Sequence, residues 1–200
     1  MPALPNELHL GHNVLTQDSI PSFNYPTITE EERLNLHLKS GVEVPENTKV
    51  IGVREIEGKR TLEAYLVPLG EDPNDFKVYL MTRGSDGNCI ESMDLGRLHK
   101  SEHQGPMRFG GNRFYTLDTS ISFNGKTGFT VHYTLTLTSI YLKNHQLTQM
   151  WRVDWDDEYE IDNDGRPIIK NRKETLREGT PAEEVVEQYK KFHTLNDKSE

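Results

Sequence analysis

The stretch from Phe114 to Ser139 constrains the fold of this chain more than any other. It consists of two runs of alternating apolar and polar residues, separated by the sequence NGKTG. Side chains along a β-strand point to opposite faces with a period of two, so each run has one apolar and one polar face. Asn124-Gly125 can supply the positive φ angles that a tight reversal requires. The pattern therefore predicts a long antiparallel β-hairpin.

Further alternating runs predict strands on both sides of this hairpin. They cover residues 50–56, 61–69, 76–82, 89–95, 147–161 and 166–173. In 147–161, Leu147, Trp151 and Trp155 share the apolar parity, and we expect both tryptophans in the core. The opposite parity of this run is acidic, and the basic strand that follows can pair with it across the sheet.

Three turn sequences, Asp86-Gly87, Asn124-Gly125 and Asp164-Gly165, recur roughly every forty residues. Four-stranded propeller blades have this spacing, and so do the successive hairpins of a meander. We therefore expect a mainly β protein, a twisted and curved antiparallel meander, with an incomplete propeller that does not close as the alternative. Residues 96–113 are rich in glycine and polar residues and predict a long loop.

The amino-terminal part predicts little regular structure. Residues 1–27 contain Pro2, Pro5, Pro21 and Pro26, and predict an extended arm rather than a packed element. Thr29 to Glu32 forms a capping box, which predicts a short helix to about Lys39. Alternating leucines from Leu34 to Leu38 leave a strand open as the alternative. Residues 28–195 are expected to form a single β-rich domain.

The carboxyl end predicts an amphipathic helix. Thr180 is expected to cap it, with Pro181 at the first helical position and Glu183 closing a capping box. Its apolar stripe consists of Val185, Val186, Tyr189 and Phe192. We expect this stripe to dock on the sheet, with docking on a partner as the alternative. Residues 196–200 are expected to form a loose tail.

Charge and hydropathy narrow the function. The formal net charge of −9 argues against a nucleic-acid-binding protein, which needs a basic surface. The same charge suits a basic protein partner. No apolar run approaches the length of a transmembrane segment. The start MPALPNELHL lacks the basic and apolar regions of a secretion leader. We expect a cytoplasmic protein as written, or a periplasmic or envelope protein if a leader has been removed.

No motif predicts an enzyme or a cofactor. The chain contains no P-loop, no GxGxxG and no GxSxG. Its single cysteine, Cys89, cannot form an intramolecular disulfide. His9 and His12, and likewise His99 and His103, lack the further ligands of a metal site, so no metal site is predicted.

The candidate binding surface lies on the polar faces of two predicted strands. It consists of Thr130, His132, Thr134, Asp154, Asp156 and Glu158. We predict that it serves a non-enzymatic protein-binding module with a basic partner. Carboxylates two residues apart on a strand are about 7 Å apart, which is within acid–base range. A hydrolase or carbohydrate-active module that uses Asp154, Asp156, Glu158 and Glu160 is therefore one alternative, and a structural envelope-associated protein is another.

Three segments, VYLMTRGSDGNCIESMDLG, RFYTLDTSISF and DDEYEIDNDGRPI, carry a resemblance. In their order they resemble small uncharacterised bacterial β-rich proteins, often exported, whose curved meander looks like part of a propeller. The resemblance covers roughly residues 50–170. Some of these proteins look like immunity proteins against secreted toxins. The resemblance thus implies protein binding and carries no catalytic residues.

Overall fold

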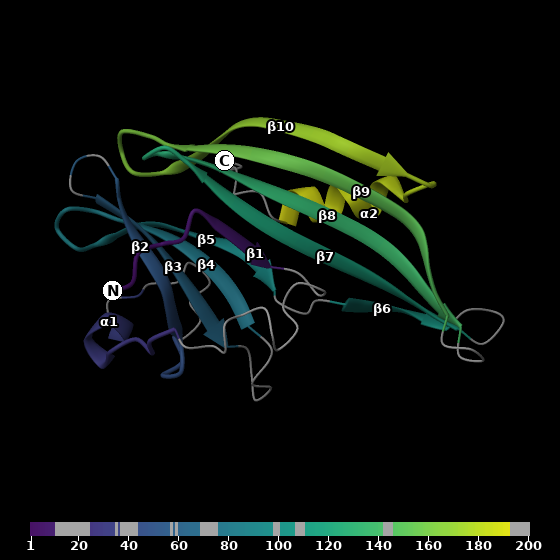
Figure 1. The fold of residues 1–200 in the computed structure, drawn as a ribbon, viewed down its shortest axis with the longest axis horizontal. Coiled ribbons are helices and arrows are strands. Elements are labelled where there is room, and N and C mark those ends of the chain that lie inside the picture. Colours follow the sequence, from purple (N-terminus) through teal and green to yellow (C-terminus); the bar gives the residue numbers. More distant parts are fainter. Residues whose placement is uncertain are drawn as a thin grey trace.

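The computed structural model describes residues 1–10, 25–34, 36, 44–56, 58, 60–68, 76–97, 101–106, 111–141 and 146–192. Within these ranges the fold is mainly β, with two antiparallel sheets and two short helices (Figure 1). The expected class, mainly β and antiparallel, is confirmed, while the incomplete propeller remains a prediction. Neither described helix has the length and apolarity needed to cross a membrane.

Sheet A is a four-stranded meander in the order β2–β3–β4–β5. Its strands are β2 (Lys49–Ile56), β3 (Arg60–Pro68), β4 (Phe76–Arg83) and β5 (Cys89–Arg97). Leu62 and Leu80 on one face belong to the main core, which sheet A shares with sheet B. Tyr65 and Met81 on the other face pack in a smaller cluster with Ile28. Both faces carry buried residues, and every residue of β3 from Leu62 to Pro68 is buried.

Sheet B has the order β1–β7–β8–β9–β10, and β6 also pairs with β7. Its strands are β1 (Glu7–Leu10), β6 (Ser101–Pro106), β7 (Gly111–Asn124), β8 (Gly128–Tyr141), β9 (Gln146–Ile161) and β10 (Pro167–Glu178). The predicted hairpin is β7–β8, with Asn124 opposite Gly128 and with Gly125 at a φ of 66°. This prediction is confirmed.

The predicted long loop over residues 96–113 is wrong for much of its length. Strand β6 lies within it, with Ser101 opposite Thr116 of β7, and β7 itself begins at Gly111. Backbone N–H and C=O groups make the ladder, so a polar, glycine-containing segment can pair with an open strand edge without apolar side chains.

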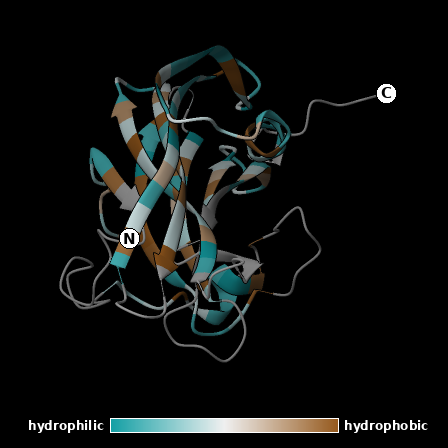
Figure 2. Ribbon diagram, turned by 90° about the vertical axis from the view of Figure 1, so that its right-hand side faces the viewer, coloured by the Kyte–Doolittle hydropathy of each residue, from teal (hydrophilic) through white to brown (hydrophobic). Residues whose placement is uncertain are grey.

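The inner face of sheet B, which faces the main core, carries the odd-numbered residues of β7, of β8 and of β9 from Trp151 onward. Figure 2 shows this alternation as bands of hydrophobic and hydrophilic colour along the strands. Trp155 is 0% exposed and stacks on Tyr133 with ring centroids 5.0 Å apart, and Trp151 is also buried. The prediction that both tryptophans lie in the core is confirmed.

Leu147 does not share this face, contrary to the sequence pattern, and is 66% exposed. The register explains the difference, because Trp151 lies opposite Leu137 and Gln149 lies opposite Thr138. Met150 is therefore an extra residue on β9, a β-bulge that reverses the alternation before Trp151.

Helix α2 (Glu183–Phe192) lies along the inner face of sheet B (Figure 1). Val186 and Tyr189 are buried in the main core, and the Tyr189 ring meets that of Tyr115 edge-on at 6.3 Å. The expected docking of this helix on the chain's own sheet is confirmed. The side chain of Phe192 lies outside the described residues.

The predicted cap of α2 is wrong. The helix begins at Glu183, and the carbonyl of Ala182 accepts its first helical bond from Val186 N–H, so Thr180 precedes the cap position. Arg177 binds the Glu183 carboxylate that the capping box required. An ion pair with a guanidinium thus replaces the reciprocal bond to Thr180.

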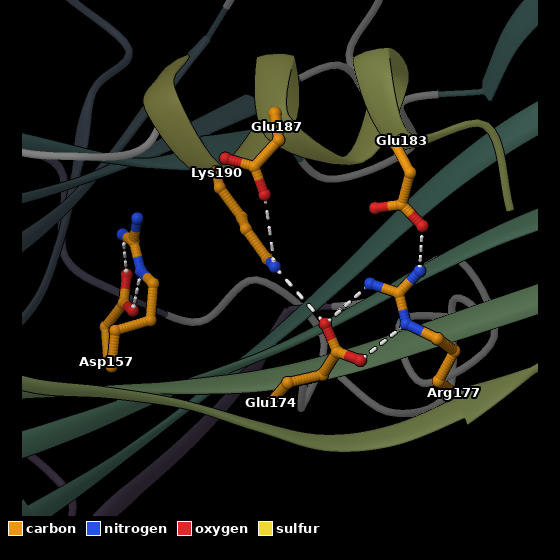
Figure 3. A network of polar contacts seen from close by, with 7 residues as sticks. Asp157, Glu174, Arg177, Glu183, Glu187 and Lys190 are labelled. Atoms are coloured by element: carbon orange, nitrogen blue, oxygen red, sulfur yellow. Dashed lines mark hydrogen bonds and ion pairs between the residues drawn. The ribbon is translucent and has the colours of Figure 1, made fainter.

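A polar network fixes α2 to β10 (Figure 3). The Glu174 carboxylate on β10 accepts hydrogen bonds from Arg177 Nε at 2.6 Å and from Lys190 Nζ of α2 at 3.3 Å. Arg177 also binds Glu183 at the start of the helix. Polar contacts at the rim thus add to the apolar contacts of Val186 and Tyr189.

Helix α1 (Glu30–Leu34) has the predicted capping box. Thr29 N–H donates to Glu32 Oε2 at 2.7 Å, and Glu32 N–H donates to Thr29 Oγ1 at 3.2 Å. The helix ends at Leu34 and Leu36 is not helical, so the predicted continuous helix to about Lys39 is wrong.

Residues 1–10 are extended, as expected, but they are also packed. Leu4 and Leu8 are buried, Ala3 bridges Val53 of β2, and β1 pairs with β7. The expectation of an unpacked arm is thus wrong for these residues, because two leucines of the segment enter the main core. The division of the chain into arm, single domain and tail remains a prediction, and residues 196–200 lie outside the described residues.

Two arginines of sheet A hold the hairpin turns of sheet B. Arg54 Nη1 donates to the Gly125 carbonyl at 3.1 Å, and its guanidinium lies 5.0 Å from the centre of the Phe123 ring. Arg60 Nη1 donates to the carbonyl of Asn163 at 2.8 Å in the β9–β10 turn. Sheet A therefore anchors β7–β10 at the turns.

Candidate functional site

All six residues of the candidate binding surface lie on one face of sheet B. We call it the outer face: it is opposite the core and carries the even-numbered residues of β7, of β8 and of β9 from Arg152 onward. The register places Thr130 opposite Glu158, His132 opposite Asp156, and Thr134 opposite Asp154. The predicted surface thus consists of three cross-strand pairs on adjacent strands, whose Cβ atoms lie about 5 Å apart.

Neighbouring strands extend these pairs into rows, which the sequence analysis did not find. Ser120 of β7 lies opposite His132, and Lys173 of β10 lies opposite Asp156. Asp118 lies opposite Thr134 in the next row. The NGKTG turn sets the β7–β8 register, so counting back from it on β7 would have identified Asp118 and Ser120.

His132 lies between two carboxylates. Its Nδ1 is 2.5 Å from Asp156 Oδ1, and its Nε2 is 4.0 Å from Asp154 Oδ2. The histidine side chain is 40% exposed, whereas that of Asp154 is only 6% exposed. The imidazole therefore links the two strands at the centre of the outer face and stays in contact with solvent.

Asp154 is held by an arginine on its own strand. Arg152 donates from Nε to Oδ1 at 2.7 Å and from Nη2 to Oδ2 at 2.5 Å. The hydrogen bond to Asp154 raises the pKa of the Arg152 guanidinium. The acidic parity seen in the sequence is therefore partly neutralised on the folded surface.

The carboxylates beyond Asp156 are more open. Glu158 is exposed and has a long contact of 3.5 Å from Asn171 Nδ2. Glu160 lies 3.0 Å from Lys170 on β10, which confirms the expected pairing of acidic and basic side chains across this hairpin. Glu158 is thus the carboxylate on this face that is best placed to receive an external cation.

The other end of the outer face carries three apolar side chains among polar ones. Leu147 lies opposite Ile140 of β8, and Phe114 of β7 lies opposite Thr138, which is two residues from Ile140. We call Phe114, Ile140 and Leu147 the apolar patch. Sequence reasoning assigned Leu147 to the core because the bulge at Met150 leaves no clear signal in the pattern.

A buried ion pair lies on the inner face instead. Arg172 of β10 donates to both carboxylate oxygens of Asp157, at 2.5 and 2.6 Å, and Asp157 is 0% exposed (Figure 3). Asp157 occupies a position that the alternation of β9 assigns to the apolar face. An acidic residue there was the signal of a buried ion pair, and the sequence analysis missed it. This pair therefore does not contribute to the outer face.

That the pairs His9–His12 and His99–His103 form no metal site stays a prediction. His12 and His99 lie outside the described residues. Among the residues that the structure describes, no three His, Cys, Asp or Glu side chains are grouped to hold a metal ion.

No protein-family model matches this chain, and searches of curated proteins and of solved structures gave no match.

Proposed function

We propose that this chain is a non-enzymatic protein-binding module whose outer face binds a basic protein partner, in the manner of an immunity protein. The observation that carries the proposal is the set of three cross-strand pairs on the outer face of sheet B. The hydroxyl groups of Thr130 and Thr134 on β8 lie beside the carboxylates of Asp156 and Glu158 on β9. Such a surface offers hydrogen-bond acceptors and negative charge to lysine and arginine side chains.

The contacts of the carboxylates favour binding over hydrolysis. Both oxygens of Asp154 accept bonds from Arg152, and Asp156 is bound by His132. A glycosidase needs one carboxyl group that is free to donate a proton and a second that is free to attack or to activate water. The backbone amides of β8 are also committed to ladders on both sides, so they are not available as an oxyanion hole.

The support beneath the face also favours binding. The inner sides of β7, β8 and β9 are fully packed, with Val131, Tyr133 and Trp155 at 0% exposure. Because these inner sides are packed, the backbone has little conformational entropy left to lose when a partner binds. The proposed partner would therefore meet a largely preformed surface.

Capture from extract of the native cells, followed by mass spectrometry, tests this function. The bait would be the natural chain, the double variant Asp156→Asn/Glu158→Gln, and the control Glu30→Gln/Glu31→Gln on α1. The two double variants lose the same charge, but the control leaves the outer face intact. We expect the natural chain and the control to retain the same basic protein, in a salt-sensitive manner, and the outer-face variant to lose it. Equal retention by all three baits would contradict the proposal.

A further inference from the structure

We infer that the partner binds through an amphipathic segment, cationic where it meets Asp156 and Glu158 and apolar where it meets the apolar patch. This inference rests on the proposed function and specifies the chemistry of its partner. The motivating observation is that the two carboxylates of β9 lie on the same face of sheet B as the apolar patch of β7, β8 and β9.

Within the apolar patch Leu147 is exposed, whereas Ile140 and Phe114 are half-buried. Leu147 is 66% exposed, whereas Leu135 and Leu137 on the inner face of β8 are buried. Ile140 on β8 lies directly across from Leu147. Phe114 on β7 lies diagonally from Ile140, within reach of a long side chain. Together these apolar side chains can contact one or two apolar anchor residues of a partner.

The distance between the two ends defines the partner segment. Eight residues of β8 separate His132, opposite Asp156, from Ile140, opposite Leu147. At roughly 3.4 Å per residue they span about 27 Å. Between them lie Thr134 and Thr138, which are neutral and can hydrogen-bond, and Thr136, which is buried. The matching partner carries its cations and its apolar anchors about eight residues apart when extended.

Charge complementarity selects a basic protein over the other occupants. A second copy of this chain would bring its own Asp156 and Glu158 against the same face, and like charges in an interface are unfavourable. An anionic membrane surface would be repelled in the same way. Arg152 does not reverse the sign of the face, because Asp154 holds it and Asp118 and Glu178 also act on it.

Fluorescence anisotropy with two synthetic peptides tests the inference. Both peptides carry the same lysine cluster, and one carries two leucines about eight residues away, which the other replaces with serine. Each pair is made with the leucines at either end, because the direction of binding is open. The proteins are the natural chain, Leu147→Ser, Asp156→Asn/Glu158→Gln, and the control Leu34→Ser on α1. Leu34 is 67% exposed, so this control removes an equally exposed leucine from another surface.

We expect the leucine-bearing peptide to bind the natural chain and Leu34→Ser equally, and Leu147→Ser about tenfold more weakly. The serine peptide should bind more weakly and should not distinguish these three proteins. If Leu147→Ser leaves both affinities unchanged while Asp156→Asn/Glu158→Gln lowers them, the apolar half of the inference is overturned and the proposed function stands. If Asp156→Asn/Glu158→Gln lowers neither affinity, or if neither peptide binds, the proposed function is overturned together with the inference.

Discussion

Trp155 is the largest side chain that the main core buries completely, and its alternating position on β9 placed it there. Replacing it with Ala removes the stacking on Tyr133 and leaves a cavity between sheet B and α2. We expect a loss of roughly 3–5 kcal/mol in the free energy of unfolding, measured by chemical denaturation, and a similar loss for Trp151→Ala. Thr134→Ala on the outer face serves as the control and should cost far less. A loss below about 1 kcal/mol for both tryptophans would contradict the assigned faces.

Asp157 and Arg172 differ in their access to water, and this difference predicts an asymmetry. Asp157 is 0% exposed, whereas the Arg172 side chain is 29% exposed. Arg172→Met leaves a carboxylate buried without its partner, and we expect a loss of about 3 kcal/mol or more. Asp157→Asn leaves a guanidinium that can turn toward solvent, so its cost should be smaller. A double-mutant cycle by chemical denaturation measures both costs and the coupling between them. Equal costs for the two single variants would contradict this account.

At the scale of elements, residue alternation predicted most strands because it is a local property. Trp151, Trp155 and the Asn124-Gly125 turn lie where the pattern placed them. The two-sheet arrangement was not predictable, because the partner of a strand depends on tertiary packing. The bulge at Met150 also left no local trace, and it moved Leu147 from the expected core to the outer face.

The candidate site could likewise be predicted only where it depends on the local pattern of residues. Parity alone placed His132 and Asp156 on one face, and the register then made them neighbours. The hydrogen bonds from Arg152 to Asp154 could not be predicted, because in the sequence these residues appear only as opposite charges two positions apart on a strand. Asp118 and the apolar patch required the pairing of three strands, which the sequence does not state.

The contact between β10 and α2 predicts a pH dependence. Hydrogen bonds from Arg177, and then from Lys190, lower the pKa of Glu174 from its ordinary 4.5 to about 2. A carboxyl group with a lowered pKa in the folded state contributes stability above the pKa of the unfolded chain and loses it as the pH falls. The contribution of Glu174 is therefore complete above about pH 4.5 and is lost on the way to about pH 2.

Thermal unfolding of Glu174→Gln as a function of pH checks this dependence. The variant should have a lower midpoint than the natural chain at neutral pH, and the difference should shrink between pH 4.5 and 2. Glu187→Gln is the matched control, because Glu187 has only a 3.5 Å contact with Lys190 and is more exposed. Two curves separated by a constant offset down to pH 2 would show that the Glu174 carboxylate does not act through its charge.

At the scale of the whole molecule, residues 1–10 join the two sheets. Leu4 N–H donates to the Val53 carbonyl at 3.0 Å, and Val53 N–H donates to the Pro2 carbonyl at 2.9 Å. Both bonds join the segment to β2 of sheet A. A few residues later, β1 pairs with β7 of sheet B, with Leu8 opposite Ile121. The amino-terminal segment is therefore a strap between the sheets, and its leucines fill the core beneath it.

Gly52 makes this strap possible and gives the sharpest test of it. A Cβ atom at Gly52 would lie 2.5 Å from Leu4 Cα and 2.8 Å from the Ala3 carbonyl carbon, so the backbone of the strap would have to move. We expect Gly52→Ala to lower the unfolding midpoint and to speed hydrogen exchange at the amides of Leu4 and Val53. The same substitution in a chain that lacks residues 1–5 should be neutral or slightly stabilising, because a strand glycine is itself unfavourable once nothing packs against it. The two truncated proteins are compared with each other, so the cost of the truncation itself cancels. An equal loss from Gly52→Ala in the full and truncated chains would mean that the clash lies elsewhere, and that the amino-terminal segment does not hold the two sheets together.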